Sequence, residues 1–590
     1  MEPSQLHTQA QSLIHSGHPE QAITLLRQNG AGKNRDAPLA LLLAHALEAA
    51  NDRPAAAEIL HRILQWRPDS AEAYLALSRI LVQMAKWEKA LDAALTAVRL
   101  APDSAEAHAA RAHALAGLGR KTEALSTLAK AAALAPDSAA IQTDLAIAQL
   151  ESGDPVSAER TLNTAAFLDP SNPQVWRLAA KIKWTLEKKD AALLALRKAV
   201  QLQPASESAR HDLARTLEQL DQREEALDHY AAEAQLAPTR AEPHYRAGEC
   251  LRALGQWEHA LAAFDAALAR DPHHILAHGG RALTLLGLGR FKEGWAEYEW
   301  RWKAPSFPSR KITLPGATEW KGEPLENKRL LVHAEQGFGD TLMLVRYVPL
   351  LARRGATITL HVPAELEPLL REMPAAHRVT STADIGPVDY TVSTFSLPRL
   401  METEAISAIP ANVPYITPDT PRTTEWSKQL APLQSPRIGI CWSGNPKYWR
   451  DASRSCPLAL CRPLFELPNI HWISLTRQIP PEDRKLMAGL PQLLDVSPQL
   501  TDFAQTAALI ANLDLVITVD TAIAHLAGAL AKPTWLLLPN VPEWRWQQTR
   551  PDSPWYPTMR LFRQPSKNNW PALITQLRNE LPHIAPRDPA

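Results

Sequence analysis

Proline recurs at intervals of 34 residues through the first half of this 590-residue chain. The members of this series are Pro68, Pro102, Pro136, Pro170, Pro204, Pro238 and Pro272. An alanine series keeps the same interval, at Ala22, Ala56, Ala90, Ala124, Ala158, Ala192, Ala226 and Ala260. A repeat of this length accommodates a pair of helices, whose apolar face is buried only when several pairs stack. The period therefore predicts a helical solenoid, a fold that offers a long surface to another protein.

The residues around the prolines support this prediction. A proline ring cannot continue the hydrogen-bond ladder of a helix, so each proline ends the second helix of its unit. Asp69-Ser70-Ala71-Glu72 and Asp103-Ser104-Ala105-Glu106 follow two of these prolines and have the pattern of helix N-caps. The chain from about residue 3 to residue 300 resembles the tetratricopeptide repeat family. We assign residues 1–302 to this solenoid.

The repeat register ends near residue 300. Gly294 and Ser306 stand where an alanine and a proline are due. The segment EGWAEYEWRW, residues 293–302, is aromatic and amphipathic, and we interpret it as the last helix. Its tryptophans either dock on the next domain or belong to an ordinary capping helix. Residues 303–326 contain four prolines and are predicted to form an ordered linker.

The composition is ordinary for a soluble globular protein, with 45% hydrophobic and 21% charged residues. The formal net charge is zero, with −5 in residues 1–300 and +5 in residues 301–590, so no global field favours nucleic acid or membrane. No apolar run reaches the length of a membrane span, and the N-terminus lacks a secretory signal. The four cysteines form no CxxC pair, which favours free thiols. We therefore expect a cytoplasmic protein.

After residue 327 the pattern changes to short apolar runs that alternate with helices. Residues 329–333 and 356–362 read as strands, separated by the glycine-containing turn EQGFGD and a helix over 341–353. Further strands are predicted at 437–442, 470–475, 515–520 and 533–538. This order predicts two doubly wound, Rossmann-like α/β domains, which we place at 327–425 and 426–590. A ligand is expected between the carboxyl ends of the two sheets.

Three motifs in this half carry a family resemblance. They are EQGFGDTLMLVRYVPLL at 335–351, WSGNPKYWRDASRS at 442–455 with Gly444, Lys447 and Trp449, and VDTAIAHLAGALAKPTWLLLP at 519–539. Together they resemble the GT-B glycosyltransferases related to the ADP-heptose:lipopolysaccharide heptosyltransferases. The resemblance implies a GT-B fold, a nucleotide-sugar donor, inversion at the anomeric carbon and catalysis without a metal. Because these motifs follow a series of repeats, the chain is similar in architecture to O-GlcNAc transferases and to bacterial flagellin-modifying enzymes.

The residues themselves suggest how a sugar diphosphate would be held. Asp520-Thr521-Ala522 lies where a strand ends and a helix begins, and amides at such a position favour a phosphate. Lys447 and Arg454 would supply cations for the leaving diphosphate. His525 lies on the same helix face, or it is a satisfied core histidine. The remaining residues of the expected donor site are Gly337, Gly339, Trp442, Ser443, Gly444 and Leu475.

Asp340 is the candidate general base. It follows Gly339 at the start of a helix, and the resemblance places the catalytic aspartate at this position. A carboxylate here would take the proton of the acceptor hydroxyl, a contribution of roughly 10²–10⁴-fold. The alternative is an ordinary N-cap. On the sugar or acceptor side we place Gln336, Trp544, Arg545 and Trp546, of which the last three would otherwise pack between domains.

We expect a metal-independent glycosyltransferase that modifies a protein acceptor bound by the repeats. One alternative keeps the enzyme and replaces the acceptor by a lipopolysaccharide or another glycan. A second alternative is a non-catalytic interaction scaffold. O-GlcNAc transferases grip peptide backbone with a ladder of asparagines, whereas residues 37–300 contain only Asn51, Asn163 and Asn172. Recognition of one folded partner therefore fits better than sequence-independent clamping.

Overall fold

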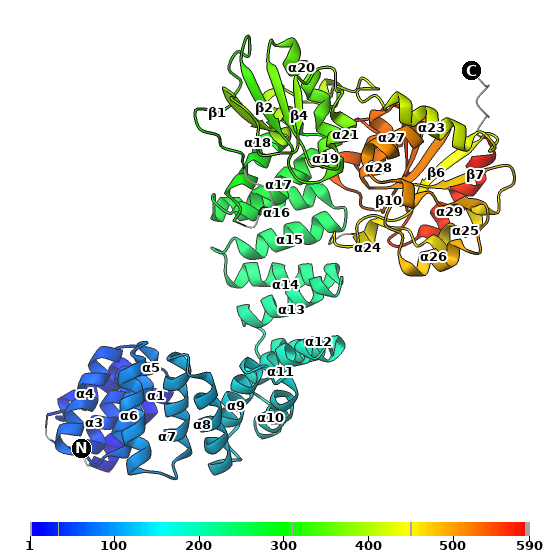
Figure 1. The fold of residues 1–590 in the computed structure, drawn as a ribbon. Helices are drawn as coiled ribbons and strands as arrows, with labels where there is room; N and C mark the ends of the chain where they lie inside the picture. Colours follow the sequence, from blue (N-terminus) through cyan, green and yellow to red (C-terminus); the bar gives the residue numbers. More distant parts are fainter. Residues whose placement is uncertain (1–2, 34, 306, 308–310, 449–450, 584–590) are drawn as a thin grey trace. The chain divides into compact units, whose positions relative to one another are not determined.

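The structure is a computed structural model that describes residues 3–33, 35–305, 307, 311–448 and 451–583. The chain forms two compact units, Met1–Leu236 and Ala237–Ala590 (Figure 1). The boundary between them falls within the repeats. The last two helix pairs of the solenoid therefore belong to the same compact unit as the two sheets.

The first unit consists of helix pairs stacked in chain order, as the 34-residue period predicts. Ser70 and Ser104 cap α5 and α7 through their side chains, and the alanine series is buried where two helices of a pair approach closely. The helices are α1 (Pro3–His15), α2 (Pro19–Gln28), α3 (Ala37–Ala49), α4 (Arg53–Trp66), α5 (Ala71–Gln83), α6 (Trp87–Leu100), α7 (Ala105–Gly117), α8 (Lys121–Leu134), α9 (Ala139–Glu151), α10 (Pro155–Leu168), α11 (Pro173–Thr185), α12 (Lys189–Leu202), α13 (Glu207–Gln219) and α14 (Arg223–Leu236).

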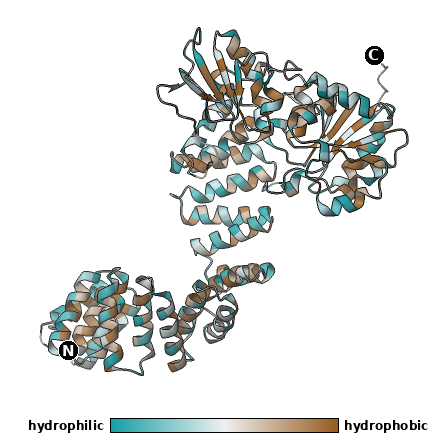
Figure 2. Ribbon diagram, in the orientation of Figure 1, coloured by the Kyte–Doolittle hydropathy of each residue, from teal (hydrophilic) through white to brown (hydrophobic). Residues whose placement is uncertain are grey.

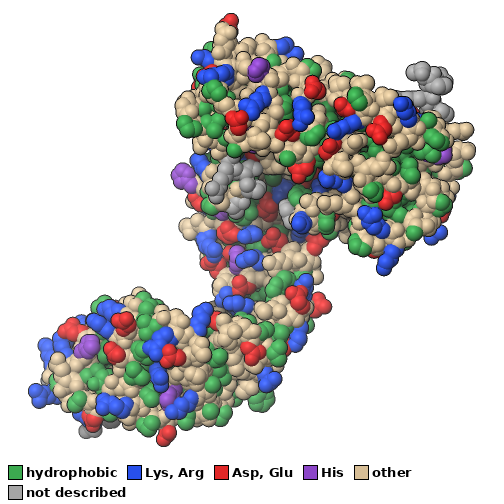
Figure 3. Space-filling model, in the orientation of Figure 1, with side chains coloured by type: hydrophobic (Ala, Val, Ile, Leu, Met, Phe, Trp, Pro, Cys, Tyr) green, Lys and Arg blue, Asp and Glu red, His purple; other side chains and the backbone are tan. Residues whose placement is uncertain are grey.

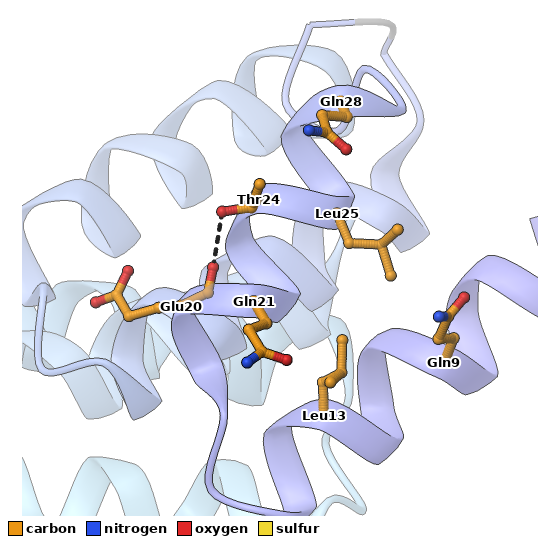
Figure 4. Close-up of a pocket in the computed structure, with 7 residues that line it drawn as sticks. All are labelled: Gln9, Leu13, Glu20, Gln21, Thr24, Leu25 and Gln28. Atoms are coloured by element: carbon orange, nitrogen blue, oxygen red, sulfur yellow. Dashed lines mark hydrogen bonds between the residues drawn. The ribbon is translucent and has the colours of Figure 1, made fainter.

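The surface of the first unit has mixed charge. On the face drawn in Figure 3, basic and acidic side chains are interspersed along the helices. A shallow groove of about 410 Å³ lies between α1 and α2 (Figure 4). Its lining residues are Gln9, Leu13, Glu20, Gln21, Thr24, Leu25 and Gln28. None of them belongs to the site predicted from the sequence.

The second unit begins with the last helices of the solenoid. These are α15 (Glu242–Ala253), α16 (Trp257–Arg270), α17 (Ile275–Gly287), α18 (Phe291–Tyr298) and the 3₁₀ turn η1 (Glu299–Lys303). Trp295 is buried, and its ring meets the ring of Trp544 edge-on at 5.4 Å between centroids. Trp295 therefore docks on the following domain, as the first interpretation predicts, whereas Trp300 stacks on His278 of the repeats.

The first sheet has the order β1-β5-β2-β3-β4, and its paired strands are parallel. Its strands are β1 (Thr318–Glu319), β2 (Arg329–His333), β3 (Thr357–His361), β4 (Arg378–Thr380) and β5 (Tyr390–Ser393). Strand β1 lies in the predicted linker, so this ordered segment adds an edge strand.

The helix expected over 341–353 is divided into α19 (Phe338–Leu344), η2 (Val345–Tyr347) and α20 (Val348–Arg353), and Pro349 lies at the start of α20. The other helical segments are α21 (Glu367–Leu370), η3 (Thr394–Ser396), α22 (Leu397–Leu400), η4 (Ile406–Ala408) and α23 (Thr420–Leu430).

The second sheet has the order β11-β10-β9-β6-β7-β8 and is also parallel. Its strands are β6 (Arg437–Cys441), β7 (His471–Ser474), β8 (Leu493–Leu494), β9 (Leu515–Val519), β10 (Thr534–Leu538) and β11 (Met559–Arg563). Its helical segments are α24 (Asp451–Arg454), α25 (Leu458–Phe465), α26 (Pro481–Met487), η5 (Ser497–Gln499), α27 (Phe503–Ala511), α28 (Ala522–Ala529), η6 (Trp544–Trp546), α29 (Trp570–Glu580) and η7 (Leu581–His583). The predicted α-solenoid followed by an α/β fold of the GT-B type, with two Rossmann-like sheets, is thus confirmed.

The inner strands of both sheets, such as β2 and β9, are largely apolar and buried, as expected for parallel strands that are covered on both faces (Figure 2). One hydrophobic core runs from Phe291 and Trp295 of α18, through Leu330 of β2, to Val516 of β9. The terminal repeat and the two sheets therefore share buried apolar surface. Among the helices of the described ranges, none is both long and apolar enough to cross a bilayer.

Candidate active site

Asp340 occupies the first turn of α19, directly after the turn that follows β2. Its Oδ2 accepts a hydrogen bond of 3.1 Å from the backbone N–H of Gly337, the N-cap position of the helix. The carboxylate therefore does satisfy one backbone donor at the helix start, as a capping side chain would. It stands at the third helical position, however, and its other oxygen is directed to a different partner.

That partner is Arg545, which lies in η6 of the second sheet domain. The guanidinium of Arg545 donates through Nη2 to Asp340 Oδ1, and both side chains are mostly buried. The guanidinium also lies over the ring of Trp544, with its carbon 4.6 Å from the centroid. Burial opposes the charge, but the carboxylates of Asp340, Glu543 and Asp520 together raise the pKa of Arg545. Arg545 is thus a permanent cation beside Asp340.

The N-terminus of α28 is the turn at which the sequence predicts a phosphate site, and its first turn is capped by a side chain. Thr521 is the N-cap in extended conformation, and its Oγ1 accepts from the N–H of Ile523 at 3.3 Å. Asp520 is buried, and burial raises the pKa of its carboxyl. The carbonyl of Asp520 accepts from Arg454 Nη1 at 2.8 Å. Arg454 is thereby brought to the turn that begins α28, as the diphosphate hypothesis requires.

A network of polar side chains supports the loop after β6. Arg454 Nε donates to Asp451 Oδ1 at 3.0 Å, and its guanidinium lies 4.5 Å from the centroid of the Tyr448 ring. A Cβ atom at Gly444 would lie 2.4 Å from Asp451 Oδ1 and 2.6 Å from Arg454 Nη2, so a side chain here would displace both of these groups. Lys447 is exposed on the same loop. Trp449, the last member of the predicted motif, lies outside the described residues.

His525 of α28 lies against α19. A Cβ atom at Gly339 would come within 2.6 Å of His525 Cδ2, which shows how closely the two helices approach. The ring of His525 stacks on Trp546 at 5.3 Å, and Nδ1 is 2.9 Å from the hydroxyl of Tyr556. Burial, together with nearby arginines, lowers the pKa of His525 well below its usual range. This is the environment of a core histidine, the alternative that the sequence left open.

Several other predicted residues have buried side chains. The indole of Trp442 donates to Asp483 Oδ2 at 2.8 Å inside the second domain, and Leu475 is also in the core. Trp544 lies between Trp295 and Trp555, so it packs between domains. These side chains support the walls of the site. Among the described residues, no hydrogen-bond partner reaches the buried hydroxyl of Ser443, at the start of the Gly444 loop.

Three residues that sequence reasoning missed tie the site together. Glu335 and Arg301 form a buried ion pair that joins the EQGFGD turn to the end of the solenoid. Arg346 of η2 is buried and donates to the carbonyl of Trp555 at 2.7 Å and to the hydroxyl of Tyr415 at 3.0 Å. Of these three residues, only Arg346 could have been singled out from the sequence. It is the one charged residue of the apolar stretch LMLVRYVPLL.

Comparison with known proteins agrees with this architecture. Residues 482–568 match the family model of glycosyltransferase family 9 (heptosyltransferase). Tetratricopeptide repeat models match residues 47–114, 115–182, 173–206 and 241–274. Protein FlbA of Caulobacter vibrioides is 28% identical over 334 residues, a match that covers 52% of this chain and 54% of that protein. The chain therefore spans about half the length of this relative.

Among solved structures, similarity is found to tetratricopeptide repeat proteins. YrrB, described as a TPR protein with an unusual peptide-binding site, is 23% identical over 33% of this chain and 100% of its own, with a TM-score of 0.29. TTC0263, a thermophilic TPR protein of Thermus thermophilus, is 23% identical over 31% of this chain and 98% of its own, with a TM-score of 0.29.

The family match relates the second compact unit to the glycosyltransferases. More particularly, the chain combines tetratricopeptide repeats with a region, residues 482–568, that is similar to glycosyltransferase family 9 (heptosyltransferase).

Proposed function

We propose that the protein transfers a sugar from a nucleotide-sugar donor to a protein acceptor that the repeats recruit. The observation that carries this proposal is the contact between α19 and α28. At Gly339 a Cβ atom would lie 3.5 Å from the Cα of Ala522, so the residue next to Asp340 touches the first residue of the phosphate-binding helix. A base and a diphosphate site side by side are what glycosyl transfer needs.

The donor diphosphate is proposed to lie on the amides at the start of α28, between Thr521 and the loop that carries Lys447 and Arg454. As the bond from the anomeric carbon to the diphosphate breaks, negative charge grows on the leaving oxygens. Cations and helix-terminal amides that face this charge stabilise the transition state more than the ground state. The backbone from Ser443 to Gly444 would border the same site.

Asp340 is proposed to take the proton of the acceptor hydroxyl while that oxygen attacks the anomeric carbon from the side opposite the diphosphate. The configuration then inverts. The carboxylate already accepts hydrogen bonds from Arg545 and from the N–H of Gly337. Since a carboxylate has about four lone-pair sites, it can still accept a hydrogen bond from the substrate hydroxyl.

The acceptor is proposed to be a folded protein. A solenoid offers an extended surface, and the scarcity of asparagine in residues 37–300 argues against clamping of a bare peptide backbone. We expect the reaction in the cytoplasm, where four buried free cysteines would stay reduced.

A thermal-shift panel of UDP-, GDP-, ADP-, dTDP- and CMP-sugars tests the proposal. One donor is expected to stabilise the wild-type chain, and that donor should label a protein acceptor from cells that normally contain the enzyme. Labelling of a lipid-linked or free glycan in place of protein would support the glycan alternative. If no donor shifts the melting temperature and none is hydrolysed, the chain is a scaffold and the proposal is wrong.

A further inference from the structure

The last turn of the solenoid holds the catalytic loop directly. Arg301, in η1, donates from Nε to Glu335 Oε1 at 2.7 Å and from Nη2 to Glu335 Oε2 at 2.9 Å. Arg301 is 7% exposed and Glu335 is 2% exposed. Two parallel hydrogen bonds between a guanidinium and a carboxylate fix orientation as well as distance. Glu335 begins the turn that leads to Asp340.

The ion pair is embedded in further contacts from both sides. Arg301 Nη2 also donates to Ser396 Oγ at 3.1 Å, and Nη1 donates to Glu299 Oε1 at 3.0 Å. Glu335 Oε2 accepts a short hydrogen bond from Ser393 Oγ. A buried pair whose remaining hydrogen-bonding groups are satisfied in this way has a single arrangement, because any other leaves a buried charge without a partner.

A second contact acts on the next residue of the turn. Gln336 adopts a left-handed backbone conformation with φ of +64°, which a residue with a side chain seldom takes. Its amide Nε2 donates to the hydroxyl of Tyr298 at 2.6 Å and to Glu335 Oε1 at 3.1 Å. Tyr298 is the last residue of α18. The unusual conformation is therefore held by a side chain of the repeats.

From these contacts we infer that Arg301 and Tyr298, in the terminal repeat, are positioning residues for Asp340. They set the backbone of residues 335–337, and this backbone in turn supplies the N–H of Gly337 that orients the Asp340 carboxylate. The role given to Asp340 rests on the proposed function. The solenoid then has two tasks: its first unit binds a partner, and its last turn completes the catalytic centre.

The test uses the full-length chain with Tyr298→Phe, which removes only the hydroxyl that receives Gln336. The matched control is Tyr230→Phe in α14, where a buried tyrosine donates to Glu218 at 2.8 Å in the first unit. Donor hydrolysis and transfer are measured with the sugar nucleotide that gives the largest thermal shift. Tyr298→Phe is expected to lower kcat about tenfold, with the KM for the donor within twofold of wild type, while Tyr230→Phe keeps both.

Arg301→Lys and Arg301→Gln give a graded second comparison. Lysine keeps the charge and loses the planar pair of donors, so it should restore part of the kcat that Arg301→Gln loses. Equal kcat in Tyr298→Phe and wild type would overturn the inference. The inference would also be overturned if kcat fell only in proportion to the amount of folded protein, with a matching decrease in melting temperature.

Hydrogen–deuterium exchange provides a readout that does not depend on activity. Faster exchange confined to residues 335–345 in Tyr298→Phe supports the inference, and unchanged exchange there overturns it. If the wild type hydrolyses no donor at all, the proposed function fails, and the exchange measurement still decides whether the terminal repeat sets this turn.

Discussion

The carboxylate of Asp340 and the guanidinium of Arg545 are 205 positions apart in the chain and form an ion pair across the junction of the two sheet domains. Each partner belongs to a different domain, so the pair exists only when both domains have folded and met. The contact also connects the proposed base to η6, which packs on α18 through Trp544 and Trp295.

Replacement of the proposed base should abolish transfer without abolishing donor binding. Asp340→Asn keeps the size of the side chain and removes the proton acceptor, so the transfer rate is expected to fall by about 10²–10⁴-fold. The thermal shift caused by the donor should persist. Asp389→Asn is the control, because Asp389 is also paired with an arginine, Arg329, in the same domain. Normal transfer by Asp340→Asn would contradict the assignment of the base.

Lys447 should contribute to donor affinity. A charge-assisted contact between an ammonium and a diphosphate is worth roughly 1.5–3 kcal/mol, so Lys447→Ala is expected to raise the Kd of the donor about tenfold or more. Isothermal titration measures this, and the thermal shift should disappear. Lys428→Ala, an exposed lysine on α23, serves as the control. An unchanged Kd in Lys447→Ala would show that the diphosphate does not bind at this loop.

Gly339 should tolerate no side chain. The Cβ of Gly339→Ala would meet His525 Cδ2 at 2.6 Å, and that ring is held by Trp546 and Tyr556. Overpacking of this kind costs typically about 1–3 kcal/mol. Gly279→Ala in α17 is the matched control: no heavy atom lies within 4 Å of its Cβ, and alanine is favoured in helices by up to about 1 kcal/mol. Thermal denaturation should therefore show opposite changes, and equal melting temperatures would refute the predicted clash.

The buried His333 at the end of β2 should make stability depend on pH. Burial lowers its pKa from 6.5 to about 4 in the folded chain. Between these values the unfolded chain binds more protons, so stability is complete above pH 6.5, falls as the pH drops toward 4, and levels off below. The loss is about 3 kcal/mol at most. Chemical denaturation of wild type and His333→Gln at about pH 7 and about pH 4.5 checks this, since the variant should lose less. Equal losses would assign the pH dependence to other groups.

The unit boundary predicts which fragments fold. Residues 237–590 contain the complete second core and should give a monomer with a cooperative melting transition. Residues 304–590 lack Arg301 and Trp295, so Glu335 would be a buried charge without its partner and Trp544 would be uncovered. This shorter fragment is expected to aggregate, as size-exclusion chromatography would show. A monomeric fragment that melts like 237–590 would mean that the terminal repeat is dispensable for folding.

Much of the fold could be predicted because its signals are local. Helix pairs leave a period in the sequence, and parallel strands leave short apolar runs such as 515–520. Arg454 and Asp520 could be placed at one site, since both belong to motifs with recognisable chemistry, and the structure brings them into contact. The pair of Asp340 with Arg545 was not, because Arg545 stands among tryptophans without any motif, and a contact over such a separation leaves no local pattern. Similarly, the spacing of Trp442 does not reveal that its side chain turns into the core.

The continuity of the core from α18 into both sheets has a consequence for how such a chain can change over time. Helix pairs before residue 237 lie in a separate compact unit, so pairs can be gained, lost or exchanged there while the chemistry stays intact. The final pairs have no such freedom. A change in the outer repeats can therefore alter the surface offered to a partner, whereas a change in α18 alters the core that both sheets share.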